Sequence, residues 1–259
     1  MKLPIFQIDT FTKRPFSGNP AAVCPLEHWL DDAEMQKIAT EINLSETAFF
    51  VNRGGYYQIR WFTPQIEVDL CGHATLASAW VIMNKIQPDI KEVIFGSHSG
   101  ELIVRQAENL YLMDFPALIP KECDIPHNLV KALGPEPKEI LATNYYLAVY
   151  DSEEKVRNLR PYMAILKELD RIGVIVTAPG KNVDFVSRFF APAVGIPEDP
   201  VTGSAHCTLI PYWSKKLNKN KMKAEQVSNR GGEIICEKKD TRVIIGGEAR
   251  LFLEGKISF

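Results

Sequence analysis

Apolar positions in the first half of the chain recur mostly at the spacing of β-strands. The expected strands are residues 5–11, 47–51, 56–62, 93–95, 102–106 and 110–115. One early helix is expected, which Asp31 or Asp32 can cap and which runs to about Ile42. Asn-Arg-Gly-Gly at 52–55 predicts a hairpin, and the last three strands are expected to form an antiparallel meander.

A second helix is expected from Gly72 to about Lys85, and it has almost no polar face. Its apolar residues are Ala74, Leu76, Ala77, Ala79, Trp80, Val81, Ile82 and Met83. A helix that is apolar all round must be surrounded by protein. Because the neighbouring segments are mostly strands, we expect a curved sheet wrapped around this helix.

Five prolines between residues 116 and 137 mark a change in composition, and we place the domain boundary there. The predicted domains are residues 1–116 and 117–259. The second is expected to contain strands at 145–150, 173–177 and 184–190, with helices at 153–166 and from Gly203. Two or three further strands close the chain, and the last of them can join the first domain.

Two motifs of the first half recur in the same order in the second half. Residues 60–64 (RWFTP) match 188–192 (RFFAP), and residues 67–74 (EVDLCGHA) match 198–205 (EDPVTGSA). The recurrence predicts a duplication, with a cleft that brings together the two helix starts at Gly72 and Gly203. Such helix starts can bind an anion, most simply a substrate carboxylate.

The loops before these helices carry carboxyl groups that could act as acids, bases or amine-binding groups. An exposed loop carboxylate is the simpler interpretation of any one of them alone. The four residues are Glu67, Asp69, Glu198 and Asp199.

The composition excludes several classes of protein. With 46% hydrophobic and 24% charged residues the chain is expected to fold, and a net charge of −2 argues against a nucleic-acid partner. The one basic cluster, residues 215–223, is expected to be a solvated loop. No apolar run reaches the roughly 18–20 residues that span a bilayer, and no signal-peptide pattern opens the chain, so no membrane partner is expected.

The five cysteines and five histidines do not pair at the spacing of disulfide or metal sites. An odd cysteine count without a Cys-x-x-Cys pair favours a reducing cytoplasm. We expect no metal, since no histidine spacing is typical of ligands. We expect no nucleotide cofactor, since neither a P-loop nor a Gly-x-Gly-x-x-Gly motif is present.

Six motifs occur in order over nearly the whole chain, at residues 6–11, 16–23, 43–49, 60–64, 71–75 and 198–205. Together they resemble the PhzF-like phenazine-biosynthesis isomerase family. The resemblance implies an α+β, diaminopimelate epimerase-like fold. In that fold, two similar domains each wrap a curved, mostly antiparallel, barrel-like sheet around a central helix, and the active site lies in the cleft.

The resemblance also assigns roles to individual residues. The glutamate of its Ser-Glu-Thr motif, here Glu46, is the proton-transfer residue. The apolar strand that follows Glu46 favours proton exchange near neutral pH. The implied substrate-binding residues are His73, Asp199, Gly72, Gly203, Ser204 and Asn19.

Epimerases and racemases of this fold use two cysteines, one at each helix start. The corresponding residues here are Cys71 and Thr202, and a threonine hydroxyl does not ionise near neutral pH. We therefore assign both residues to the wall of the substrate site. The expected activity is a cofactor-independent isomerase of a small unsaturated amino or hydroxy carboxylic acid, and the resemblance implies a homodimer.

Three alternatives stay open. The chain could be an amino-acid racemase that uses Cys71 opposite Glu46 or Asp199. A hydrolase built on Cys71 and His73 is disfavoured, because two side chains so close across a helix start are expected to diverge. The chain could also be a binding protein that kept the fold and lost the chemistry.

Overall fold

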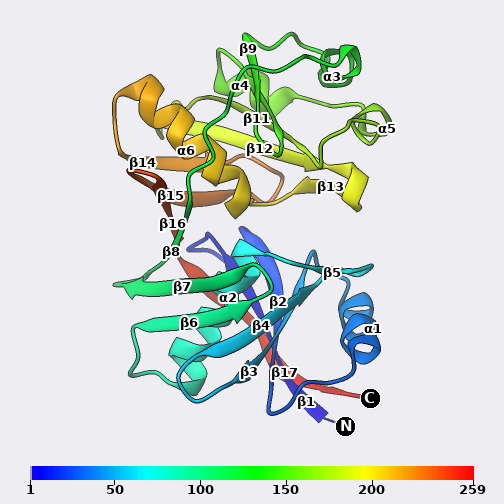
Figure 1. Ribbon diagram of the computed structural model, residues 1–259, viewed down its shortest axis with the longest axis vertical. Coiled ribbons are helices and arrows are strands. Elements are labelled where there is room, and N and C mark those ends of the chain that lie inside the picture. The colour runs from blue at the N-terminus through cyan, green and yellow to red at the C-terminus, as the bar shows by residue number, and fades with distance from the viewer. Residues whose placement is uncertain (1) are drawn as a thin grey trace. The chain divides into compact units, whose positions relative to one another are not determined.

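The computed structural model describes residues 2–259, which form two compact units (Figure 1). The first unit contains the chain up to Asp114 together with Gly246–Phe259, and the second is Phe115–Ile245. Two strands, β8 (Leu110–Pro116) and β16 (Arg242–Gly247), run from one unit into the other. Within residues 2–259, no helix is long and apolar enough to cross a membrane.

The first unit is a mostly antiparallel sheet in the order β17-β1-β2-β3-β4-β6-β7-β8, with β2–β3 and β4–β6 parallel. A short strand, β5, extends the edge of β4. Their bounds are β1 (Lys2–Thr10), β2 (Asn19–Leu26), β3 (Thr47–Asn52), β4 (Tyr57–Phe62), β5 (Glu67–Val68), β6 (Glu92–Ser97), β7 (Gly100–Ala107) and β17 (Ala249–Ser258).

Helix α2 (Gly72–Val81) is the centre of the first unit. All its residues from His73 to Ala79 are buried, and it packs on β1, β2, β3, β7 and β17. A π-helical turn, Ile82–Ile86, continues it. Helix α1 (Asp32–Ile42) packs its buried Met35 and Ile38 against a cluster of buried strand residues. The prediction of an apolar helix enclosed by a curved sheet is confirmed.

The second unit has a sheet in the order β9-β10-β11-β12-β14-β15, with β10–β11 and β12–β14 parallel. Strand β13 pairs with β12. The bounds are β9 (Glu139–Ala142), β10 (Tyr146–Val149), β11 (Val174–Pro179), β12 (Phe185–Ala191), β13 (Ile196–Asp199), β14 (Lys221–Gln226) and β15 (Gly232–Lys239).

Helices cover both faces of this second sheet. Helix α3 (His127–Leu133), α4 (Glu153–Asn158) and α5 (Met163–Leu166) share a core with Val174 and Val176 of β11. Thr177 points to the opposite face, where its Oγ1 accepts a 2.9 Å hydrogen bond from the indole Nε1 of Trp213 in α6 (Gly203–Leu217).

The two units repeat one topology. In the first, β2 pairs in parallel with β3, β3 antiparallel with β4, and α2 leads to β6 in parallel with β4. In the second, β10 pairs in parallel with β11, β11 antiparallel with β12, and α6 leads to β14 in parallel with β12. This shared order of pairings is what a duplicated sequence gives, in agreement with the repeated motifs.

Two predicted segments were wrong. The helix at 153–166 is split into α4 and α5, because Pro161 disfavours helical backbone at the residue before it. Most of the basic cluster at 215–223 is not a loop, since Lys215 lies in the last turn of α6 and Lys221 begins β14. In that strand exposed lysines alternate with the buried Met222 and Ala224, which is the period of a half-buried strand.

Candidate active site

Glu46 and His73 meet at the N-terminus of α2. Glu46 directly precedes β3, and His73 is the second residue of the helix. The Nε2 atom of His73 lies 3.2 Å from Oε2 of Glu46, and both side chains are largely buried. Burial lowers the pKa of His73 to about 3. The imidazole is therefore neutral near pH 7, where the contact joins a carboxyl group to an uncharged ring.

Cys71 extends this contact on the other side of the imidazole. Its Sγ lies 3.4 Å from Nδ1 of His73. The expectation that these two side chains diverge is wrong. Cys71 is the N-cap residue with an extended backbone (φ −141°, ψ 107°), so its side chain turns back over the first turn of the helix. A thiol, an imidazole and a carboxyl group thus form one buried chain of contacts.

Asn19 and Gly72 lie beside this chain of contacts. Asn19 is fully buried at the start of β2, and its Oδ1 accepts a 3.5 Å hydrogen bond from Oγ of Ser45, the neighbour of Glu46. The backbone oxygen of Glu46 accepts a 3.3 Å hydrogen bond from Ala22 of β2. Strand pairing therefore fixes the backbone that presents the carboxyl group.

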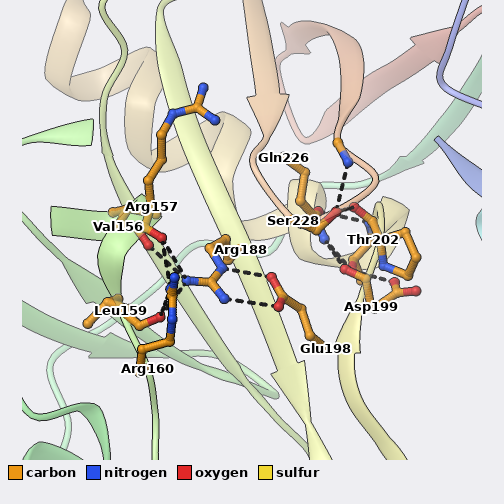
Figure 2. Close-up of polar contacts among 12 residues, drawn as sticks. Val156, Arg157, Leu159, Arg160, Arg188, Glu198, Asp199, Thr202, Gln226 and Ser228 are labelled. Carbon is orange, nitrogen blue, oxygen red and sulfur yellow. Dashed lines mark hydrogen bonds and ion pairs between the residues drawn. The ribbon is translucent and has the colours of Figure 1, made fainter. Parts of the chain in front are cut away.

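At the N-terminus of α6, Asp199 and Thr202 are held by a glutamine (Figure 2). Thr202 is the N-cap residue, but its Oγ1 donates a 2.5 Å hydrogen bond to Oδ2 of Asp199 instead of capping the helix. Gln226 accepts from the Thr202 N–H at 2.9 Å and donates to the Asp199 carbonyl at 2.8 Å. Sequence reasoning missed Gln226, because it lies at the end of β14 and belongs to no local motif.

Ser204 and Tyr145 form a second polar pair in the second unit. The Tyr145 hydroxyl lies 3.1 Å from Oγ of Ser204, the residue after Gly203. Burial raises the pKa of Tyr145, so its hydroxyl stays protonated at neutral pH. Tyr145 was also missed, since an aromatic residue at the start of the strand predicted at 145–150 is typical of a hydrophobic core.

Two of the four loop carboxylates are bound by an arginine. Arg60 binds Glu67 through Nε and Nη2, at 2.7 and 2.6 Å. Arg188 binds Glu198 in the same way, at 2.7 and 2.9 Å (Figure 2). The hypothesis that Glu67 and Glu198 act as acids or bases is therefore replaced by a structural role. Each pair ties the short strand before a helix start to its neighbouring strand.

The position of Glu46 in the first unit has no carboxyl counterpart in the second. The backbone oxygen of Glu46 bonds to Ala22, and that of Gly173 bonds to Tyr146, at 3.3 and 3.1 Å, between equivalent strands. A Cβ atom at Gly173 would lie 2.7 Å from the Phe189 ring. The duplicated fold therefore holds a carboxyl group at this point in one copy alone.

Comparison with known proteins places these residues in context. The profile of the family described as phenazine biosynthesis-like protein matches residues 8–255. The chain is 52% identical to an uncharacterized isomerase of Pseudomonas aeruginosa over 99% of both chains. The crystal structure of a phenazine biosynthesis PhzF family protein from Enterococcus faecalis matches 100% of both chains, with 49% identity and a TM-score of 0.97.

A more distant structural match supports the predicted fold class. A probable proline racemase from Agrobacterium radiobacter has a TM-score of 0.68 with 8% identity, over 99% of this chain and 93% of that one. At this identity the likeness shows the fold alone. The prediction of a diaminopimelate epimerase-like α+β fold is confirmed.

Proposed function

Because this chain belongs to the phenazine biosynthesis-like family and is an isomerase of that family, we propose that it moves a proton on a small unsaturated amino or hydroxy carboxylic acid. The reaction uses no cofactor, and Glu46 is its general acid and base. The observation that carries the proposal is the buried Glu46 carboxyl in contact with a neutral imidazole at a helix N-terminus.

Glu46 removes a proton from a carbon made acidic by an adjacent double bond or carbonyl group, and returns it at another position of the same system. The carboxyl group ends each cycle in the state in which it began. His73, whose pKa is lowered to about 3, stays neutral throughout. It acts as a hydrogen-bond donor that stabilises the displaced negative charge.

In each unit the helix start, at Gly72 in the first and at Gly203 in the second, has backbone donors that can bind a substrate carboxylate. Neither helix is capped by the side chain of its N-cap residue, which supports this role. Asp199 binds the amino or hydroxyl group of the substrate. Its contacts with Thr202 and Gln226 fix its position. Ser204 adds a hydroxyl donor, and Asn19 lies beside the base.

The test is proton exchange in a panel of unsaturated amino and hydroxy acids in deuterated water, followed by NMR. We expect the wild-type chain to incorporate deuterium into one member. Glu46→Gln, which keeps the shape of the side chain, is expected to lower the exchange rate at least about 100-fold. Its affinity for the same acid in calorimetry should be nearly unchanged. Exchange at the wild-type rate in Glu46→Gln would contradict the proposal.

A racemase is the second candidate, because the Cys71 thiol contacts His73. The residue in the place of the second thiol is Thr202, whose hydroxyl donates a hydrogen bond to Asp199, and this argues against a racemase. Cys71→Ser separates the two functions, because only the racemase loses its exchange activity. The contact between Cys71 and His73 does not support a hydrolase, since an imidazole with a pKa of about 3 is a poor base for the thiol.

A further inference from the structure

Three different metal-ligand types converge at the first turn of α2. The thiol of Cys71, the imidazole of His73 and the carboxyl group of Glu46 place one ligand atom each within 4.8 Å of one another. The three residues are 6%, 5% and 9% exposed. We propose that they form a binding site for a thiophilic divalent cation of the Zn²⁺ class, which blocks the carboxyl group.

The spacing of the ligand atoms fits such an ion. Zinc takes four tetrahedral ligands with bonds of about 2.0–2.3 Å, so its ligand atoms lie roughly 3.3–3.8 Å apart. Sγ of Cys71 and Nδ1 of His73 already have this spacing, at 3.4 Å. The carboxyl group of Glu46, which now lies beside Nε2 of the same ring, swings to the Nδ1 side to supply the third ligand, and water takes the fourth position.

The ring and the thiol can both offer a lone pair to the ion. A metal binds the imidazole of His73 through the ring nitrogen that carries no proton. Its Nε2 finds no well-aligned hydrogen-bond acceptor among residues 2–259, although Oε2 of Glu46 lies 3.2 Å away. On binding, the thiol of Cys71 forms the sulfur–metal bond and releases one proton to solvent.

The sequence did not predict this site, because the expectation of no metal rested on histidine spacing. The three ligands come from the loop before β3 and from the start of α2, and only folding brings them together. An ion bound there occupies the proposed base, so the inference concerns inhibition of that site. The ion is neither a cofactor nor a participant in the reaction.

Cobalt is the probe, because its spectrum reports both geometry and thiolate ligation. The reduced, chelator-treated full-length chain is titrated with Co²⁺ and then with Zn²⁺. We expect one equivalent of Co²⁺ to give tetrahedral bands and a thiolate charge-transfer band, both removed by Zn²⁺. Cys71→Ser should lose the charge-transfer band, and Glu46→Gln should keep it while binding at least tenfold more weakly.

Cys123→Ser is the matched control, because Cys123 is a partly exposed thiol outside this cluster. It should titrate like the wild type. An octahedral spectrum without charge transfer, or a Cys71→Ser titration identical to that of the wild type, would overturn the inference. The proton-exchange assay is run separately in excess chelator, so failure of the proposed isomerase chemistry is distinguishable from failure of metal binding.

Discussion

Glu46 and Gly173 stand at equivalent places in the two units, each directly before a strand that pairs in parallel with its neighbour. One holds the carboxyl group that contacts His73. The other is packed so closely against Phe189 and Phe190 that no side chain fits. At this position the two copies therefore differ in the space left beside a single Cα atom.

Gly173→Ala tests this packing. A Cβ atom there would lie 2.7 Å from the Phe189 ring and 2.8 Å from the Phe190 backbone oxygen. We expect the free energy of unfolding to fall by about 1–3 kcal/mol in urea titration. Gly55→Ala is the control, because its Cβ atom meets nothing within 4 Å. Equal free energies of unfolding for the two variants would contradict this prediction and show that the residues around Gly173 can move to accept a methyl group.

His206 makes the stability of the second unit depend on pH. Burial lowers its pKa from 6.5 to about 4, so between these values the unfolded chain binds a proton that the folded chain does not. Proton binding by the unfolded chain lowers the free energy of unfolding. That free energy has its full value above pH 6.5 and decreases as the pH falls towards 4. At pH 5 the loss is about 2 kcal/mol. Urea unfolding at pH 7 and pH 5 should show a smaller difference for His206→Asn than for the wild type.

At the scale of elements, the two Arg–Glu pairs hold the segments that lead into α2 and α6. Arg188 is the more deeply buried of the two arginines, and its Nη1 also donates to the carbonyls of Val156 and Leu159 (Figure 2). Its guanidinium lies 4.8 Å from the centre of the Phe190 ring. One side chain thus joins β12, β13 and the end of α4.

Arg188→Lys should therefore be costly although it keeps the charge. Lysine cannot bind a carboxylate in the bidentate manner while also reaching two carbonyls. We expect a loss of about 2–4 kcal/mol in the free energy of unfolding. Arg157→Lys, at half-exposed ion pairs with Glu153 and Glu225, should change stability by less than about 1 kcal/mol. If Arg188→Lys lost no more stability than Arg157→Lys, the structural role of Arg188 would be contradicted.

Sequence reasoning reached the elements whose signals are local. The enclosed helix after Gly72 was predicted from its missing polar face, and the hairpin of β3 and β4 from its Asn-Arg-Gly-Gly turn. Gln226 and Tyr145 were not predicted as site residues, because their contacts with Thr202 and Ser204 join residues far apart in the chain. The roles of Glu67 and Glu198 depended on arginine partners that only strand pairing reveals.

At the scale of the whole molecule, the resemblance to the PhzF-like family implies a homodimer. Light scattering coupled to gel filtration should then give twice the chain mass of 29.2 kDa at micromolar concentration. A monomer mass that does not change with concentration would contradict this expectation.

The presence of a carboxyl group at the Glu46 position, and of a glycine at its counterpart Gly173, has a stereochemical consequence. In the proposed reaction one base, Glu46, both removes and returns the proton, while Gly173 provides no partner acid on the equivalent strand of the second unit. The proton then returns to the face of the substrate that it left. A chiral product labelled in deuterated water should carry its deuterium on that one face, whereas a two-base enzyme would deliver the label to the opposite face.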